Sequence, residues 1–198
     1  MRKTRKAAAI LTAAAMAAAS AMPVMADEIK DLYDYETQAR EVETWNILHS
    51  QSAADLNVLT NLYDGLVEAD EYGKVVPAIA ESWETEDNGI TWTFHLREGV
   101  KWVDQNGNEK GEVTAQDFLT GLEWILNFHK NDAANTSMPM EMIVGAEDYY
   151  NMTSELDADA GFALTAESPE FADTVGIKAI DDYTLQYTCL SEKPYFDT

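Results

Sequence analysis

A β-hairpin at residues 82–97 constrains the fold more than any other part of this sequence. Asp87-Asn88-Gly89 supplies residues that accept a left-handed backbone, between two runs rich in tryptophan and threonine. The second run alternates strictly, with apolar residues Ile90, Trp92, Phe94 and Leu96 on one face and Thr91, Thr93, His95 and Arg97 on the other. We therefore expect a sheet with one buried face, in which this aromatic stripe packs in the core and is not a platform for a ligand.

The rest of the chain alternates short strands with helices. Leu56, Leu59, Leu62 and Tyr63 recur at helical spacing, which predicts a helix over residues 53–63 that is ended by Gly65. Thr114 and Asp117 have the spacing of a capping box in front of an apolar stripe, which predicts a helix over residues 115–128.

Four further segments complete the expected fold. They are a strand over residues 44–49, a helix over 141–151, an acidic surface excursion over 154–173, and a second hairpin over 175–180 and 183–188 joined at Asp181-Asp182. The predicted fold class is α/β, in the mixed α+β sense.

The first residues have the pattern of a secretory signal peptide. Four cations, Arg2, Lys3, Arg5 and Lys6, precede an apolar run over residues 7–21 that is too short to span a bilayer. Val24-Met25-Ala26 then predicts cleavage after Ala26, which makes residues 1–26 the signal peptide and residues 27–43 a leader. We expect an exported protein, periplasmic or extracellular.

The number and position of cysteines bear on lipid anchoring and on disulfide formation after export. Cys189 lies far from the cleavage position, so the sequence predicts no lipid anchor, and one cysteine cannot form an intramolecular disulfide. Its apolar neighbours, Leu185 to Leu190, favour a buried small hydrophobe over a reactive thiol.

The chain is strongly acidic. Its formal net charge is −23, and removal of the signal peptide leaves 9 Lys and Arg against 36 Asp and Glu, a net charge of −27. Such a field repels nucleic acid and anionic membrane surfaces, so neither is expected as a partner. Solubility outside the cell explains most of this charge.

No motif for catalysis or metal binding stands out. His49, His95 and His129 fall on separate expected elements, and scattered structural histidines are the favoured interpretation, although a site assembled in three dimensions stays open. Residues 104–108 begin like a calcium loop, but Glu109 stands where glycine is needed and Ala115 where a carboxylate is needed, so a turn is expected. Residues 157–159 fail in the same way. We assign no catalytic residue, no metal and no cofactor.

Five stretches in order resemble the family 5 extracellular solute-binding proteins, the peptide-binding components of ABC importers. They are Leu62 to Val67, Val76 to Trp83, Trp92 to Trp102, Val113 to Phe118, and Gly176 to Leu185 with Pro194-Tyr195-Phe196 after it. The resemblance implies a periplasmic-binding-protein-like fold of type II, cluster C, in which two lobes close on a solute. It implies that residues 44–198 form the amino-terminal lobe and that the second lobe is absent, so the fold is incomplete.

The same resemblance implies what the protein binds and where. It implies a non-enzymatic, monomeric protein that captures peptides and delivers them to the permease subunits of an ABC transporter. The ligand contacts of this lobe would come from the turn Ser50, Gln51, Ser52 and Ala53. Other solutes on the same fold, such as a nickel complex or a sugar, stay open, as do a secreted hydrolase and a truncated fragment that binds nothing.

Overall fold

The computed structural model describes residues 41–130 and 135–197 of the 198 residues. The expected signal peptide, its cleavage after Ala26 and the leader up to residue 40 lie outside the described residues. The strands are β1 (Val67–Ala69), β2 (Val75–Pro77), β3 (Ala80–Glu86), β4 (Thr91–Leu96), β5 (Lys101–Val103), β6 (Glu109–Glu112), β7 (Ile177–Asp181) and β8 (Thr184–Thr188). The helices are α2 (Ala53–Leu59), α3 (Ala115–Leu126), α4 (Ser137–Met142), α5 (Ala146–Ser154), α6 (Ala158–Ala163) and α7 (Pro169–Ala172).

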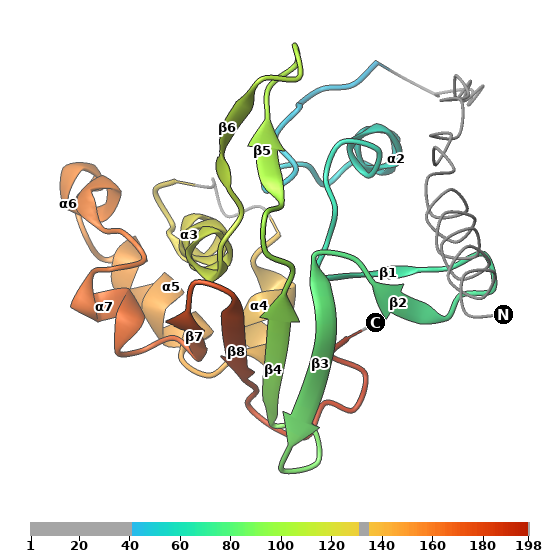
Figure 1. The fold of residues 1–198 in the computed structure, drawn as a ribbon. Helices are drawn as coiled ribbons and strands as arrows, with labels where there is room; N and C mark the ends of the chain where they lie inside the picture. Colours follow the sequence, from blue (N-terminus) through green and yellow to red (C-terminus); the bar gives the residue numbers. More distant parts are fainter. Residues whose placement is uncertain (1–40, 131–134, 198) are drawn as a thin grey trace, which may run out of the picture. The chain divides into compact units, whose positions relative to one another are not determined.

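The centre of the fold is a four-stranded antiparallel sheet in the order β3-β4-β8-β7 (Figure 1). Both predicted hairpins are confirmed: β3 and β4 form the first, and β7 and β8 form the second. The two hairpins meet where β4 pairs with β8, for instance at Phe94 and Leu185. The turn of the first hairpin has the expected left-handed backbone, with φ of 52° at Asp87, 57° at Asn88 and 90° at Gly89.

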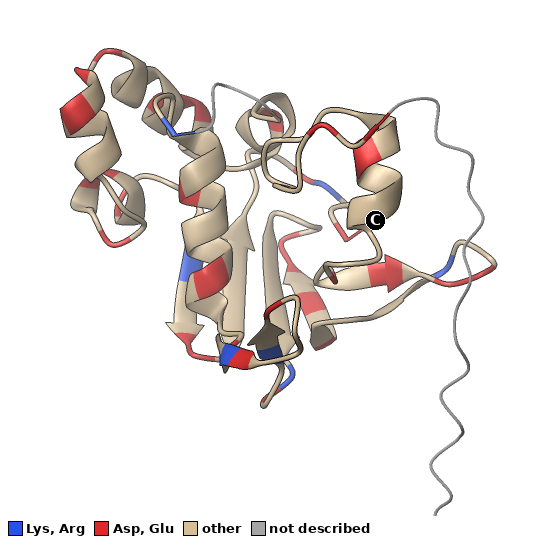
Figure 2. Cartoon of the chain, turned by 90° about the horizontal axis from the view of Figure 1, so that it is seen from above, with Lys and Arg blue, Asp and Glu red and all other residues tan. Residues whose placement is uncertain are grey.

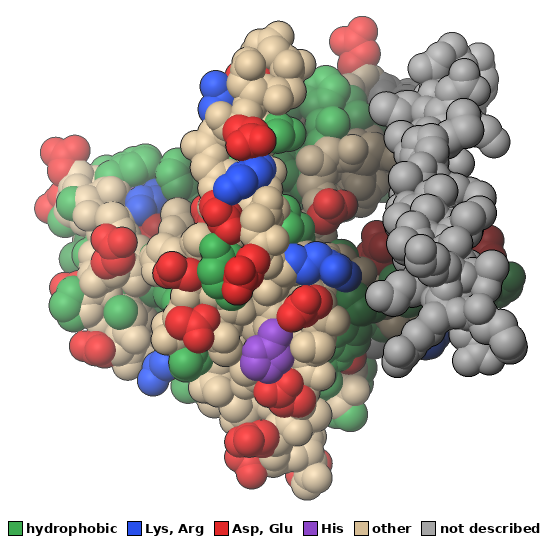
Figure 3. Space-filling model, viewed as in Figure 1, with side chains coloured by type: hydrophobic (Ala, Val, Ile, Leu, Met, Phe, Trp, Pro, Cys, Tyr) green, Lys and Arg blue, Asp and Glu red, His purple; other side chains and the backbone are tan. Residues whose placement is uncertain are grey.

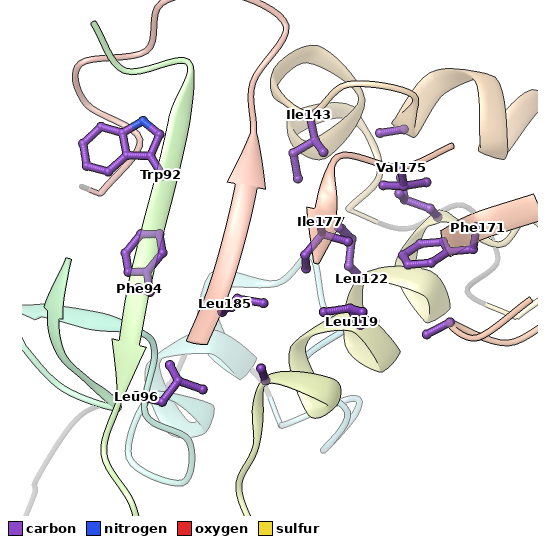
Figure 4. Packing of buried hydrophobic residues seen from close by; sticks show 14 of the residues in the cluster. Trp92, Phe94, Leu96, Leu119, Leu122, Ile143, Phe171, Val175, Ile177 and Leu185 are labelled. Carbon is purple, nitrogen blue, oxygen red and sulfur yellow. The ribbon is translucent and has the colours of Figure 1, made fainter. Parts of the chain in front are cut away.

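The alternation along β4 sorts its side chains as expected. Trp92, Phe94 and Leu96 are buried, and Ile90 is half-buried. Helix α3 covers the other half of the same face, so that Leu119 and Leu122 join the cluster that contains Ile177 and Leu185 (Figure 4). The aromatic stripe is therefore core, and burial of large apolar side chains of this kind contributes about 1.5–3 kcal/mol each.

The opposite face of the sheet is polar. His95 of β4 lies next to Glu84 of β3, at 3.0 Å, and both side chains are exposed. Figure 3 shows acidic side chains gathered over this face. Figure 2 shows Asp and Glu spread over the helices and strands with few Lys and Arg between them. The sheet is thus one-sided, which is typical of antiparallel sheets that cover a core.

Helix α3 begins where the capping box predicts. The carboxylate of Asp117 accepts hydrogen bonds from the backbone N–H of Thr114 at 2.7 Å and from its hydroxyl at 3.2 Å. The helix ends at Leu126, two residues earlier than expected, because Asn127 adopts an extended backbone with ψ of 112°.

The strand expected over residues 44–49 is wrong. The backbone N–H groups of His49 and Ser50 both donate to the carbonyl of Asn46 at 3.1 Å, which closes a turn. The side chain of Asn46 also accepts from the N–H of Leu48, and the hydroxyl of Thr44 accepts from the N–H of Asn46. These local side-chain bonds satisfy the backbone without a neighbouring strand.

The helix expected over residues 53–63 is shorter than predicted. Helix α2 ends at Leu59, and Asn61 and Leu62 continue it only as tight turns, with N–H groups that donate three residues back. Side chains of Thr60 and Asn61 both donate to the carbonyl of Asn57, at 3.3 and 2.9 Å. Such bonds compete with the helical ladder, so the helix ends well before Gly65.

The helix expected over residues 141–151 is two helices, α4 and α5, which are separated at residues 143–145. The N–H of Val144 donates to the carbonyl of Thr188 at 3.0 Å, and Ile143 pairs with Cys189 across an isolated bridge. The chain leaves the helix to extend the sheet and re-enters it at Gly145, whose φ is 70°. Periodicity along one segment cannot reveal this pairing with another.

The acidic segment 154–173 is not a surface excursion. It forms α6 and α7, and Phe171 is fully buried, with its ring edge-on to that of Tyr149 at 5.1 Å. Ala166 is buried as well. The many exposed carboxylates concealed this apolar contact in the sequence.

Two smaller ladders complete the described residues. Strands β1 and β2 form one, and β5 and β6 form a hairpin arm whose loop is the rejected calcium motif. That loop is the expected turn, with the N–H of Gly107 donating to the carbonyl of Asp104 at 2.8 Å. Within the described ranges, no helix has the length and apolar character needed to cross a membrane.

Candidate functional site

The turn proposed from the resemblance, residues 50–53, joins the turn at 44–50 to helix α2. Two of its side chains face inward: Ser50 is 2% exposed and Ser52 is 8% exposed. The other two, Gln51 and Ala53, are exposed. The structure therefore divides the four predicted residues into a buried pair and an exposed pair.

The buried pair is held by Asp55, which is itself 1% exposed. The hydroxyl of Ser50 donates to the Asp55 carboxylate at 3.0 Å and accepts from the N–H of Ser52 at 3.3 Å. Ser52 is the N-cap of α2 and accepts from the N–H of Asp55 at 3.4 Å. The second carboxylate oxygen of Asp55 accepts from the N–H of Glu43 at 3.0 Å. Both serine hydroxyls are thus used to shape the turn.

A distant residue also holds the turn. The side-chain amide of Asn135, just before α4, donates to the carbonyl of Ser50 at 2.7 Å and lies 3.4 Å from that of Leu48. Neither Asp55 nor Asn135 stood out in the sequence. Asp55 could have been found by its position three residues after a serine at a helix start, whereas nothing local marks Asn135.

The structure also has a shallow cleft of about 550 Å³ at the end of the central sheet. It contains none of residues 50–53, and its lining is acidic: Glu81, His95, Leu96, Glu98, Asp181, Asp182, Tyr183 and Thr184. The backbone N–H of Tyr183 and then the hydroxyl of Thr184 lower the pKa of Asp181, so this carboxylate is charged at neutral pH. None of the residues that the sequence predicts as ligand contacts lines this cleft.

The histidines and the cysteine occupy the separate positions that the sequence indicates. His49 lies in the turn before Ser50, His95 on β4, and the ring of His129 is 3.1 Å from the carbonyl of Leu156. Over residues 41–130 and 135–197, no three His, Cys, Asp or Glu side chains form a group that could hold a metal ion. Cys189 is buried as predicted, and burial raises the pKa of its thiol.

The described fold combines a one-sided antiparallel sheet with a separate turn, next to helix α2, at which Gln51 and Ala53 are exposed. The chain belongs to the bacterial extracellular solute-binding proteins of family 5. The family profile, described as "Bacterial extracellular solute-binding proteins, family 5 Middle", matches residues 74–197.

Known relatives and structures agree with this family. The oligopeptide-binding protein AmiA of Streptococcus pneumoniae is 35% identical over 191 residues, which are 96% of this chain and 26% of that protein. A crystal structure of the substrate-binding domain of an oligopeptide ABC transporter from Bacillus anthracis has a TM-score of 0.63 and 29% identity, over 82% of this chain and 27% of that one. The complex of Haemophilus influenzae OppA with the peptide RPPGFSPFR has a TM-score of 0.56 and 29% identity, over 75% and 25%.

These comparisons confirm the predicted family and fold class. The fold is a mixed helix and sheet fragment of the OppA-type periplasmic-binding-protein fold. The chain spans about a quarter of the length of the curated relatives that it matches.

Proposed function

We propose that this chain is part of an extracytoplasmic solute-binding protein that captures peptides and passes them to the permease subunits of an ABC importer. The observation that carries the proposal is the match of nearly the whole chain to AmiA, a protein named as oligopeptide-binding. A structural relative that was crystallised with a nine-residue peptide supports the same ligand class. In this role the protein is a monomer and performs no catalysis.

The proposed organisation follows the resemblance. Residues 1–26 direct export and are cleaved after Ala26, and residues 27–43 are a leader to the folded part. Residues 44–198 supply the amino-terminal lobe, and the peptide is enclosed between this lobe and a second one. The protein then works in the periplasm or outside the cell, where its acidic surface keeps it soluble.

The proposed contacts of this lobe are Ser50, Gln51, Ser52 and Ala53. In this proposal the hydroxyls of Ser50 and Ser52 hold the turn in shape, and the main-chain groups and neutral side chains of the exposed residues Gln51 and Ala53 face the ligand. An extended peptide can be held through such main-chain groups without selection for its side chains.

Ligand-dependent melting of the full chain tests the ligand class. A mixed pool of di- to hexapeptides should raise the melting temperature, since a ligand at 100 times its Kd stabilises the folded state by about 2.7 kcal/mol. Matched pools of sugars and of nickel complexes serve as controls. A shift with either of these pools and none with peptides would assign a different solute to the same fold.

The position of the site is tested by steric blocking. Ala53→Trp places a large ring on the exposed side of the turn, so it should weaken peptide binding at least tenfold while the ligand-free melting temperature stays the same. Thr120→Trp, on the exposed side of α3, is the matched control. Equal peptide affinities for the two variants would exclude residues 50–53 from the site.

A further inference from the structure

The hydrogen bonds that hold the turn at residues 50–53 come from two sources. Those within the segment join Ser50, Ser52 and Asp55, all close in sequence. Among the hydrogen bonds of the described residues, the side chain of Asn135 makes the only ones that reach residues 44–53 from residues 64–197. Among the described residues, the Asn135 amide is therefore the hydrogen-bonding link between this turn and residues 64–197.

The side-chain amide of Asn135 bonds to residues that are far away in the sequence. Its backbone has φ of 53°, one of three such non-glycine residues among those described, and the other two form the β3–β4 turn. A left-handed asparagine commonly bonds to the backbone within its own turn. The Asn135 amide instead reaches carbonyls 85 and 87 residues away, with the shorter distance, 2.7 Å, to Ser50.

The bond to Ser50 has a geometric consequence for Gln51. The carbonyl of Ser50 and the N–H of Gln51 belong to one planar trans peptide unit, in which the two groups point in opposite directions. Holding the carbonyl toward Asn135 therefore turns the N–H of Gln51 away from it. That N–H makes no hydrogen bond to any residue that the structure describes.

We propose that Asn135 is a positioning residue, which orients the Ser50–Gln51 peptide unit so that the N–H of Gln51 donates to a main-chain carbonyl of the bound peptide. This inference rests on the proposed function and names the donor in the proposed site. A hydrogen bond to a main-chain carbonyl does not depend on the side chains of the bound peptide, which suits a ligand class of varied sequence. Pre-orientation by Asn135 removes the entropic cost of fixing this donor at binding.

Two variants, Asn135→Gly and Asn135→Asp, test the effect of the side-chain amide separately from that of the left-handed backbone conformation. Glycine adopts a positive φ freely, so Asn135→Gly removes only the donor, and Asn135→Asp replaces the donor with a carboxylate that repels both carbonyls. Each variant should bind a peptide from the stabilising pool about tenfold more weakly than the wild type. Asn88→Gly is the matched control, because Asn88 also has a positive φ, of 57°, in the β3–β4 turn.

A second measurement needs no ligand. The NMR order parameter of the Gln51 N–H should fall from about 0.85 in the wild type to below about 0.6 in Asn135→Gly, and it should not change in Asn88→Gly. An order parameter of the Gln51 N–H that is unchanged in Asn135→Gly overturns the positioning role. If the wild type binds peptide, an unchanged peptide affinity of the Asn135 variants overturns it as well. A wild type that binds no peptide in the full chain defeats the proposed function and the donor assignment together, while the order parameter still decides whether Asn135 orients the turn.

Discussion

At the scale of single residues, Glu112 is the carboxylate with the most informative surroundings. It accepts hydrogen bonds from the hydroxyl of Tyr183 at 2.6 Å, the N–H of Gly99 at 2.7 Å and the ammonium of Lys101 at 2.8 Å. The Lys101 bond first, then those of Tyr183 and Gly99, lower the pKa of Glu112 from 4.5 to about 2. In return, Glu112 raises the pKa of Tyr183 to about 12. One side chain thus ties the β5–β6 arm to the loop of the second hairpin.

The lowered pKa of Glu112 predicts a pH dependence of stability. A carboxyl group whose pKa is lower in the folded state stabilises that state above its unfolded pKa, and this contribution is lost as the pH falls through the folded value. Wild type should therefore be more stable than Glu112→Gln at pH 7, and the difference should shrink from about pH 4.5 and vanish near pH 2. Urea unfolding across this range measures it, with the exposed Glu86→Gln as the control. A gap that is constant with pH would contradict the assignment.

At the scale of elements, the contrast between two glycines shows how α5 is placed. A Cβ atom on Gly145 would lie 2.0 Å from the carbonyl oxygen of Thr174, and φ there is +70°. A Cβ atom on Gly121, inside α3, would meet nothing within 4 Å. Gly145 is required because two chain segments approach each other closely there, whereas Gly121 only lowers the stability of helix α3.

The same substitution should consequently have opposite effects at these two positions. Gly145→Ala should destabilise the fold by more than about 2 kcal/mol, because it combines backbone strain with a clash against main chain. Gly121→Ala should stabilise it by about 0.5–1 kcal/mol, the ordinary gain of alanine over glycine in a helix. Urea unfolding of both variants is the measurement, and a neutral Gly145→Ala would show that α5 can shift to make room.

Elements with local signals could be predicted from the sequence, and elements made by distant partners could not. The turn at Asp87-Asn88-Gly89 and the Thr114–Asp117 cap carry their cause within a few residues, and both are present. The break between α4 and α5 is caused by pairing with Cys189 and Thr188, more than forty positions away. For the candidate site, the turn was found only by resemblance, and its distant bond to Asn135 needed the structure.

At the scale of the whole described fold, a buried polar network joins α3 to α5 and to the segment after α6. Glu123 of α3 is 2% exposed and accepts from the hydroxyl of Tyr149 at 2.8 Å and the side-chain amide of Asn127 at 2.9 Å. Lys130 donates to Glu123 at 2.8 Å and to the carbonyl of Leu164. Burial and then the Glu123 bond raise the pKa of Tyr149, which therefore keeps its proton and acts as a donor. The sequence showed only the apolar stripe around Glu123.

Two lysines in ion pairs make a matched test of this network. Lys130→Met leaves Glu123 buried without its cation and should destabilise the fold by about 3–5 kcal/mol. Lys110→Met breaks a pair with Asp104, at 2.9 Å, in which the lysine side chain is exposed and the aspartate half-buried, and it should cost no more than about 1 kcal/mol. In Glu123→Gln/Lys130→Met no unpaired charge remains, so this double variant should recover much of the loss in a urea titration. If Lys130→Met costs no more than Lys110→Met, water reaches Glu123, and the Lys130–Glu123 ion pair contributes no more to stability than the Lys110–Asp104 pair.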